Sequence, residues 1–303
     1  MKKIDFHVHI LDPISAEDSA SYFRDYCLRK DVEAIGIMAC TENGEHLDCN
    51  EQAMAIHRLL PNSYVFAALL RNEDFVEQAK RYMREGFHGI KLLDGKPSEY
   101  RYYGYGIDDP RYEPFFAYAE QEEIPLLFHN NDPARFWDRE RMTPYELEQG
   151  WLYDESLPPH EDFFCMIENV LAKHPRLRIA LAHFGFYADD LERASRLLEA
   201  YPNLMLDATP ALCIFEDLSA TPEQTRAFFI RYHDRIFYGT DVYNEITGST
   251  REKNDQKTAL MQAFYEGDAP LTYGKYSVKG MQFDPSLLQE IYCDNALRFI
   301  GQM

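Results

Sequence analysis

The stretch KIDFHVHI, residues 3–10, is a short apolar run of strand-forming residues that carries two histidines. Similar apolar, β-branched runs recur along the whole chain, at 33–40, 64–70, 87–93, 124–130, 178–184, 204–209 and 236–242. Segments with helical spacing separate these runs, for example between Asn72, an expected helix cap, and Gly86, which suits a helix end. Strands that alternate with helices in this way predict repeated βα units and a parallel sheet.

Eight strand candidates favour a closed (β/α)8 barrel, or TIM barrel, that forms a single domain over residues 1–303. An open, doubly wound sheet is the competing architecture. It usually has fewer strands and often a Gly-rich phosphate loop, and neither GxGxxG nor GxxxxGK occurs in this sequence. Shorter patterns predict a helix that begins at Thr221, with Pro222 at its first position and Gln224 completing a capping box, and a final helix at 285–299 after Asp284.

Two long segments, 131–160 after the fifth strand and 243–284 after the eighth, break the regular spacing. Both are polar and aromatic, and 255–266 within the second has the spacing of a short helix. Loops that follow barrel strands lie at the carboxyl-end face, where barrel enzymes place their active sites. The two segments are therefore candidate lids or specificity loops, or alternatively contacts of a homo-oligomer.

The chain is strongly acidic, because 31 Lys and Arg residues face 51 Asp and Glu residues and the net charge is −20. Nucleic-acid binding needs a concentrated positive patch, and no long run of Lys or Arg supplies one. No stretch reaches the roughly 18 apolar residues of a membrane span, and Asp5, His7 and His9 fall where a signal peptide would need apolar residues. Six cysteines without a CxxC pair favour neither a disulfide framework nor a cysteine zinc site. We therefore expect a cytoplasmic protein that binds neither nucleic acid nor membranes.

Polar residues with metal-binding chemistry fall near the carboxyl ends of the expected strands. His7 and His9 are two positions apart in the first strand, so their side chains point to the same face. The others lie late in the fourth, fifth, sixth and eighth runs: Lys91, His129, His183 and Asp241. Burying so many polar groups costs free energy unless they are paired or ligated. Imidazoles with a carboxylate suit Zn²⁺, which we expect first, and also Mn²⁺, Fe²⁺, Co²⁺ or Ni²⁺.

With HxH in the first strand, PLLFHN at the fifth, LAHFG at the sixth and GTD at the eighth, the chain resembles the metal-dependent amidohydrolase superfamily. The resemblance runs from Asp5 to the dipeptide Asn295–Ala296. The branch that is most similar contains hydrolases and nonoxidative decarboxylases, including enzymes similar to aminocarboxymuconate semialdehyde decarboxylase. The resemblance implies a metal ion with four protein ligands and a further histidine beside it. The implied ligands are His7, His9, His129 and Asp241, with His183 as the neighbour.

Lys91 bears on whether the resemblance implies one metal ion or two. In two-metal members a lysine of the fourth strand is carboxylated and bridges both ions, and the sixth-strand histidine binds the second ion. Lys91, in FHGIKLL, lies about where that lysine would be. A GIK run also occurs in relatives whose lysine stays a free ammonium. Two alternatives therefore stand: one ion, or two ions with a carboxylated Lys91 and His183 as further ligands.

The leading functional prediction is hydrolysis of an amide, lactone or ester-like bond in a small organic molecule. A bound metal ion lowers the pKa of water from 15.7 to about 7 and polarises a carbonyl oxygen, so the metal-bound water becomes the nucleophile. Asp241 would accept the proton of that water and return it to the leaving group, and His183 would stabilise the developing negative charge. The alternatives are nonoxidative decarboxylation of an unsaturated or aromatic acid by the same ligands, and a catalytically silent barrel that binds a metal.

Substrate contacts are expected from residues that follow the barrel strands. Arg71 after the third strand and Arg135 after the fifth are candidates to bind a substrate carboxylate, because a guanidinium matches a carboxylate bidentately. Tyr103, in an aromatic stretch after the fourth strand, is a candidate to line a pocket for a planar ring. The alternative for each arginine is an ion pair with the abundant Asp and Glu residues of the loops, and for Tyr103 it is packing of its loop onto the barrel.

Overall fold

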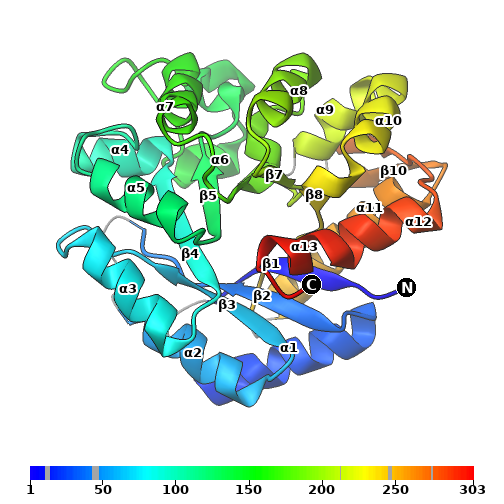
Figure 1. The fold of residues 1–303 in the computed structure, drawn as a ribbon. Helices are drawn as coiled ribbons and strands as arrows, with labels where there is room; N and C mark the ends of the chain where they lie inside the picture. The colour runs from blue at the N-terminus through cyan, green and yellow to red at the C-terminus, as the bar shows by residue number, and fades with distance from the viewer. Residues whose placement is uncertain (11–13, 43–47, 212, 245–247, 274–275) are drawn as a thin grey trace.

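Within the residues that the structure describes, nine short strands form one parallel sheet in the order β8-β7-β6-β5-β4-β3-β2-β1-β9 (Figure 1). This computed structural model describes residues 1–10, 14–42, 48–211, 213–244, 248–273 and 276–303. The strands are β1 (Ile4–His9), β2 (Ala34–Met38), β3 (Ser63–Ala68), β4 (Gly89–Gly95), β5 (Leu126–Asn130), β6 (Ile179–Leu181), β7 (Leu204–Asp207), β8 (Ile236–Phe237) and β9 (Val242–Tyr243).

The sheet closes on itself where β8 and β9 meet β1. β9 pairs with β1 at Val8 and His9. The link between β8 and β9 is held to the same strand, since the N–H of Phe6 donates to the carbonyl of Tyr238 at 3.1 Å and the N–H of Asp241 donates to the carbonyl of His7 at 2.8 Å. The result is the predicted (β/α)8 barrel, in which the eighth predicted strand, 236–242, is divided into β8 and β9.

Helices lie around the outside of this barrel and across its ends (Figure 1). They are α1 (Ala16–Lys30), α2 (Cys49–Leu59), α3 (Phe75–Glu85), α4 (Pro97–Tyr103), α5 (Glu113–Gln121), α6 (Pro144–Glu148), α7 (His160–Lys173), α8 (Leu191–Ala200), α9 (Ile214–Ala220), α10 (Pro222–Arg231), α11 (Gly248–Glu266), α12 (Pro285–Gln289) and α13 (Asn295–Phe299). No helix in the described part of the chain combines the length and the apolar character that crossing a membrane requires.

Several helix ends differ from the sequence prediction. Asp74, and not Asn72, caps α3, because its carboxylate accepts from the N–H of Glu77 at 2.9 Å; Gly86 ends the helix in the left-handed region as predicted, at φ 96°. Thr221 precedes α10 without a side-chain capping hydrogen bond, so the predicted capping box with Gln224 is wrong.

The segment after β9 contains more regular structure than predicted, and the final helix is less regular than predicted. α11 occupies Gly248–Glu266, whereas the pattern predicted a helix only at 255–266. A small antiparallel pair, β10 (Pro270–Tyr273) and β11 (Tyr276–Lys279), follows it. The predicted final helix at 285–299 contains a π-helical turn, η5 (Glu290–Asp294), between α12 and α13.

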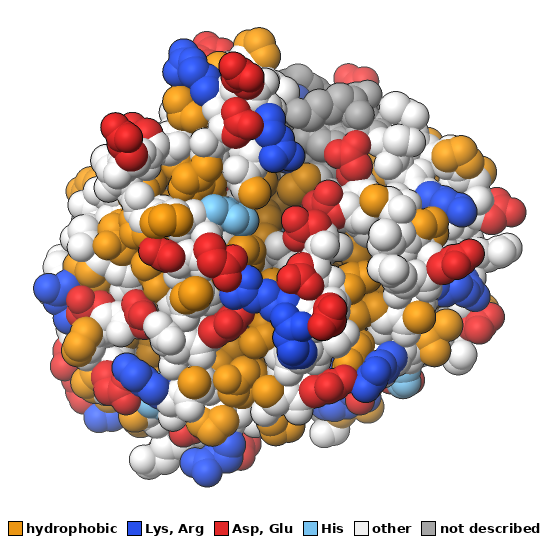
Figure 2. All heavy atoms as spheres, turned by 90° about the horizontal axis from the view of Figure 1, so that it is seen from above, with side chains coloured by type: hydrophobic (Ala, Val, Ile, Leu, Met, Phe, Trp, Pro, Cys, Tyr) orange, Lys and Arg blue, Asp and Glu red, His pale blue; other side chains and the backbone are white. Residues whose placement is uncertain are grey.

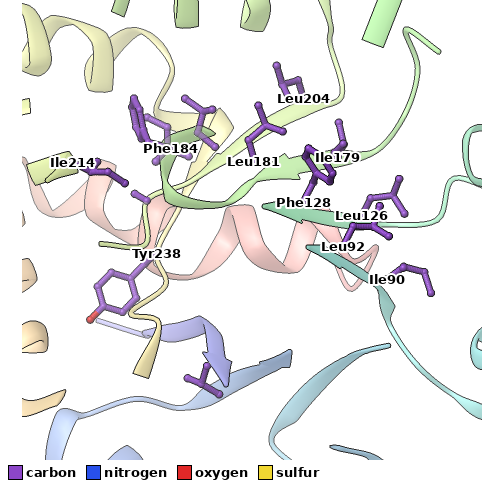
Figure 3. Close-up of a cluster of buried hydrophobic side chains, with 14 of the residues drawn as sticks. Ile90, Leu92, Leu126, Phe128, Ile179, Leu181, Phe184, Leu204, Ile214 and Tyr238 are labelled. Carbon is purple, nitrogen blue, oxygen red and sulfur yellow. The ribbon is translucent and has the colours of Figure 1, made fainter. Parts of the chain in front are cut away.

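Apolar side chains alternate between the two faces of the barrel wall, as period-two strands require. The outward-facing set packs under the helices and includes residues of β4, β5, β6 and β7, several of which Figure 3 shows. Its labelled members are Ile90, Leu92, Leu126, Phe128, Ile179, Leu181, Phe184, Leu204, Ile214 and Tyr238. Lys91 and His129 occupy the alternate positions, so the strands that build this outer core direct both polar side chains to the barrel interior.

A second apolar cluster fills one end of the barrel interior. The ring of Phe6 lies 5.5 Å from that of Phe66, 5.1 Å from that of Phe237 and 6.2 Å from that of Phe299 in α13. The buried amide of Asn295 ties this final helix to β8, because Nδ2 donates to the carbonyl of Ile236 at 2.7 Å. The interior is therefore plugged by aromatic rings at the end where α13 packs, and the polar side chains lie at the other end.

We expect Phe299→Ala to lower the free energy of unfolding by about 3 kcal/mol, because it removes a buried ring and leaves a cavity that its neighbours fill only in part. Urea denaturation followed by circular dichroism measures this loss. Leu28→Ala is the control, since Leu28 is 80% exposed and its truncation should change the unfolding free energy by less than about 0.5 kcal/mol. Equal stability of the two variants would contradict the proposed role of the aromatic plug.

Candidate metal centre

His7, His9 and Asp241 bring three potential metal-ligand atoms together at the polar end of the barrel, all within 4.8 Å of one another. Nε2 of His7 lies 2.9 Å from Nε2 of His9. Oδ1 of Asp241 lies 3.1 Å from Nε2 of His9 and 4.0 Å from Nε2 of His7. The first and eighth predicted strands thus bring these three candidate ligands into one group.

An irregularity in β1 directs both histidines to the interior. The pairing of β1 with β2 shifts register between Asp5 and Val8. Phe6 belongs to the inner aromatic cluster and Val8 to the outer core, so His7 and His9 point inward beyond the shift. A bulge of this kind re-aims side chains next to a functional site, and here one short strand supplies both the barrel plug and two candidate ligands.

Asp207 lies directly behind His7. Its Oδ2 is 2.5 Å from Nδ1 of His7, and Thr209 Oγ1 is 3.2 Å from the same nitrogen. Burial raises the pKa of Asp207 to about 7, although the hydrogen bond from Thr209 and the charge of Lys91 oppose the shift. When Asp207 is ionised it only accepts, so Nδ1–H of His7 donates to it and Nε2 presents its lone pair to the group. The sequence pattern did not single out Asp207, although it lies near the end of the seventh predicted strand, 204–209, where the other candidate site residues also lie on their strands.

The turn that carries Asp241 is fixed by the buried carboxylate of Asp5. The N–H of Thr240 donates to Asp5 Oδ1 at 2.9 Å, and its hydroxyl donates to Oδ2 at 2.5 Å. The Tyr26 hydroxyl donates to the same oxygen at 2.6 Å. Asp241 itself adopts φ 56°, in the left-handed region that Asp tolerates better than most residues. These bonds explain why Gly239, Thr240 and Asp241 hold a conformation that their local sequence alone would not maintain.

Cys40 and Tyr243 surround the second histidine of β1. Cys40 Sγ lies 3.3 Å from Nδ1 of His9, and the Tyr243 ring stacks on the imidazole at 5.1 Å between centroids. Burial alone would lower the pKa of His9, but Cys40 and the carboxylate of Asp241 outweigh it and raise the pKa to about 9. The surroundings of His9 therefore stabilise positive charge at the imidazole.

The donor atoms of this group fit a divalent metal ion. Zinc–ligand bonds of about 2.0–2.2 Å in a tetrahedron place neighbouring ligand atoms roughly 3.3–3.6 Å apart. The three separations here are 2.9, 3.1 and 4.0 Å. Nε2 of His7 presents a lone pair when Nδ1–H donates to Asp207, and the surroundings of His9 favour positive charge. Close by, Nδ1 of His183 is buried and has no hydrogen-bond partner among the described residues. Both features favour a cation at this position.

Asp241 is a stable carboxylate in this setting. Burial alone would raise its pKa, but the ammonium of Lys257 and the imidazole of His9 hold the pKa well below its usual range. Lys257 Nζ lies 3.6 Å from Asp241 Oδ2 and donates to the main-chain carbonyl of Asp241 at 2.7 Å. Lys257 belongs to α11, so the long segment after β9 contributes a charge to the site that the sequence analysis did not assign.

His129 and His183 lie in the same chamber but are not part of the three-residue group. Their ring centroids are 4.7 Å apart, and the His183 ring is 5.7 Å from that of His7. His183 adopts φ 55° just after β6, in the short helix η3 (Ala182–Phe186). Nε2 of His129 lies 3.4 Å from Asp132 Oδ1. The predicted ligand role of His129 stays a prediction, and the structure places His129 beside the group with a carboxylate partner of its own.

Lys91 is buried in the barrel interior and its Nζ lies 3.3 Å from Nε2 of His7. Burial lowers its pKa, although the nearby acidic groups partly oppose the shift. A protonated amine at this distance from a ligand atom would repel a divalent ion. Lys91 is placed where a neutral or carboxylated amine would meet the metal, so both alternatives for its role stay open.

The three predicted substrate-binding residues have partners within the protein. Arg71 Nε pairs with Asp94 Oδ1 at 2.8 Å, and its guanidinium lies 3.8 Å from the centre of the Tyr103 ring. Arg135 pairs with Glu146 at 2.6 Å. These contacts match the ion-pair and loop-packing alternatives, and the substrate roles remain predictions. On the face shown in Figure 2, basic side chains likewise lie interspersed with acidic ones.

A cavity of about 300 Å³ has Phe186 in its lining, and Phe186 also borders the chamber. The Phe186 ring lies 5.7 Å from that of His129 and 5.6 Å from that of His183. The charged residues of the cavity lining are Arg135, Arg141, Asp189, Glu216 and Asp217. Burial raises the pKa of Asp217 to about 6, and the charges of Asp189 and Glu216 add to the shift. The cavity carries both signs of charge, so it is not a simple carboxylate pocket.

A family model described as Amidohydrolase matches residues 4–302. Gamma-resorcylate decarboxylase from Rhodococcus jostii (strain RHA1) is 30% identical over 104 residues, and the match spans 33% of this chain and only 29% of that relative's length.

Solved structures show the same barrel. 2,6-Dihydroxybenzoate decarboxylase from Rhizobium superposes with a TM-score of 0.57 and 17% identity over 99% of both chains. A probable 2-pyrone-4,6-dicarboxylic acid hydrolase from Acinetobacter baumannii superposes with a TM-score of 0.58 and 13% identity, over 99% of this chain and 100% of that one. At such low identities the likeness establishes the fold alone.

Proposed function

Because this chain belongs to the amidohydrolase family, we propose that it is a metal-dependent hydrolase that cleaves an amide, lactone or ester-like bond in a small organic molecule. The observation that carries the proposal is the convergence of His7, His9 and Asp241 at the polar end of the barrel. The family model spans nearly the whole chain, which supports an intact catalytic domain over a silent barrel. Zinc is the proposed ion. Cytoplasmic location and a homo-oligomeric state stay predictions from the sequence.

Each polar residue of the chamber has a separate role in the proposed hydrolysis. A divalent ion held by His7, His9 and Asp241, with His129 beside them, would supply a Lewis acid and lower the pKa of a water molecule to about 7. Asp207 holds the imidazole of His7 in the orientation that a ligand needs. Asp241 accepts a proton at its carboxylate and returns it to the leaving group. His183 offers an imidazole nitrogen to the negative charge that develops on the substrate oxygen.

Nonoxidative decarboxylation is the second candidate, and the partial identity with gamma-resorcylate decarboxylase favours it. The same chamber would bind an unsaturated or aromatic acid, and a side chain would then have to protonate the carbon atom that loses carbon dioxide. The family model is compatible with both reactions; the hydrolase proposal stands first because Asp241 offers an ionised carboxylate as a proton acceptor, and the decarboxylase relative matches only 104 residues.

A single experiment separates the two reactions. The metal-loaded protein is incubated in H2¹⁸O with a panel of lactones, amides and ¹³C-carboxyl-labelled aromatic or unsaturated acids. We expect a lactone or amide to be consumed and ¹⁸O to appear in its carboxylate product. Release of ¹³CO2 without ¹⁸O incorporation into product would instead assign decarboxylation and overturn the hydrolase proposal. Protein stripped of metal by a chelator is the control, and it should be inactive in either case.

A further inference from the structure

Asp132, the second residue after β5, belongs to the 131–160 segment and contacts the candidate ligand His129. The Asp132 side chain is buried, and its residue is only 7% exposed. Its two carboxylate oxygens have different partners. Oδ1 faces Nε2 of His129 at 3.4 Å, and Oδ2 accepts from the hydroxyl of Tyr153 at 2.7 Å. Asp132 therefore connects a candidate ligand on the barrel wall with a residue twenty-one positions further along the chain.

The pair between His129 and Asp132 orients the imidazole. Oδ1 of Asp132 lies 3.4 Å from Nε2 of His129, where a carboxylate oxygen accepts the hydrogen of that ring nitrogen and leaves Nδ1 for another partner. The ring plane and the tautomer of His129 are then set by Asp132, in the way that Asp207 sets those of His7.

Further hydrogen bonds connect Asp132 and its neighbour Asn131 to His160, at the other end of the segment. Nε2 of His160, at the start of α7, donates to the main-chain carbonyl of Asp132 at 3.0 Å. Nδ2 of Asn131 donates to the carbonyl of His160 at 3.1 Å. Tyr153 itself packs in a small apolar cluster with Phe136 and other residues of the segment. The position of the Asp132 carboxylate thus depends on the packing of the whole segment.

We propose that Asp132 is a positioning residue for His129 and that Tyr153 fixes Asp132, so that the packed 131–160 segment tightens metal binding at the barrel mouth. The inference rests on the proposed metal-dependent function, because it assumes that His129 contacts the ion. It assigns to the segment a role that is separate from substrate contact. The role needs no movement of the main chain, since the hydroxyl of Tyr153 and the carboxylate of Asp132 already meet.

The test is the metal affinity of Tyr153→Phe, which keeps the ring and its packing and removes only the hydroxyl. Zn²⁺ dissociation constants are measured by competition with a chromogenic chelator. We expect the variant to bind Zn²⁺ several-fold more weakly than the unaltered chain, because it removes the partner of Asp132; the loss of an outer-shell partner of a ligating histidine is typically about 10-fold or more. Asp132→Asn should show a loss at least as large. In the Co²⁺-loaded protein, the visible absorption bands of both variants should shift, because the orientation of one ligand changes.

Tyr145→Phe is the matched control, because Tyr145 belongs to the same segment but is 57% exposed. Its Zn²⁺ affinity and Co²⁺ spectrum should equal those of the unaltered chain. Unchanged affinity and spectrum in Tyr153→Phe and Asp132→Asn, with normal metal binding by the unaltered chain, would overturn this inference and leave the proposed function intact. Failure of the unaltered chain itself to bind Zn²⁺ or Co²⁺ would overturn both.

Discussion

The double variant His7→Ala/His9→Ala is expected to lose its metal ion and at least about 1000-fold of its activity. Each outer-shell partner of a metal ligand is worth about 10-fold to 100-fold in affinity or activity, so removing two direct ligands should exceed that. The two imidazoles approach within 2.9 Å at their Nε2 atoms, so the double variant removes two of the three grouped donor atoms. Plasma mass spectrometry of protein purified without chelator measures the metal, and the assay that the substrate panel identifies measures turnover.

A second pair of neighbouring imidazoles provides the control. The rings of His57 and His88 lie 5.6 Å apart on the outside of the barrel, and His57 Nδ1 contacts the Ser63 hydroxyl at 2.9 Å. His57→Ala/His88→Ala should keep its metal and its activity. Metal retained at full affinity in His7→Ala/His9→Ala would show that these histidines are not the ligands, and the proposed centre would be wrong.

The same measurement decides the role of Lys91. We expect about one equivalent of metal per chain, as in single-ion catalytic sites that keep an open position. About two equivalents, falling to one in Lys91→Ala, would instead establish a carboxylated Lys91 that bridges two ions. A free amine beside His7 Nε2, at 3.3 Å, should leave the stoichiometry at one in both proteins.

The barrel was predictable because the signals that specify it are local. Each strand candidate is a short apolar run, and each carries its own alternation of inward and outward residues. His7 and His9 were placed on one face by that alternation alone, and the structure confirms that placement. The β1 register shift was not predictable, because it depends on how Phe6 packs against rings of β3, β8 and α13.

The parts of the site that were missed depend on contacts between distant residues. Asp207 meets His7 across 200 positions of sequence, and no local pattern marks that pair. Asp132 was hidden for a different reason, because it lies in a polar loop where an acid is unremarkable until Tyr153 and His129 are seen to meet it. For Arg71 the sequence left two roles open, a substrate contact and an ion pair, and only the structure shows its contacts with Asp94 and the Tyr103 ring.

Asp241→Asn is expected to lower kcat by about 100-fold to 10000-fold at saturating metal, the range for loss of a general acid–base residue. The substitution preserves the size of the side chain, and Asn tolerates the left-handed conformation that residue 241 adopts at φ 56°. The hydrogen bonds from Thr240 to Asp5 remain, so the turn should keep its shape. What is lost is a negative charge that can accept a proton and offset the charge of the ion.

Loss of metal and loss of the base can be separated in this variant. Titration with Zn²⁺ first establishes the concentration at which Asp241→Asn is fully loaded, and kcat and KM are then compared with those of the unaltered chain at that concentration. A fall in kcat that persists at saturation, with a smaller change in KM, identifies Asp241 as the proton acceptor, because a residue that only bound the ion would regain its activity. Asp234→Asn, an exposed site on η4 (His233–Arg235), should match the unaltered chain. Full activity of Asp241→Asn at saturating Zn²⁺ would show that the carboxylate takes no proton. The proton transfer would then have to be assigned to another group in the chamber. His183 is the next candidate, because its buried Nδ1 has no hydrogen-bond partner among the described residues.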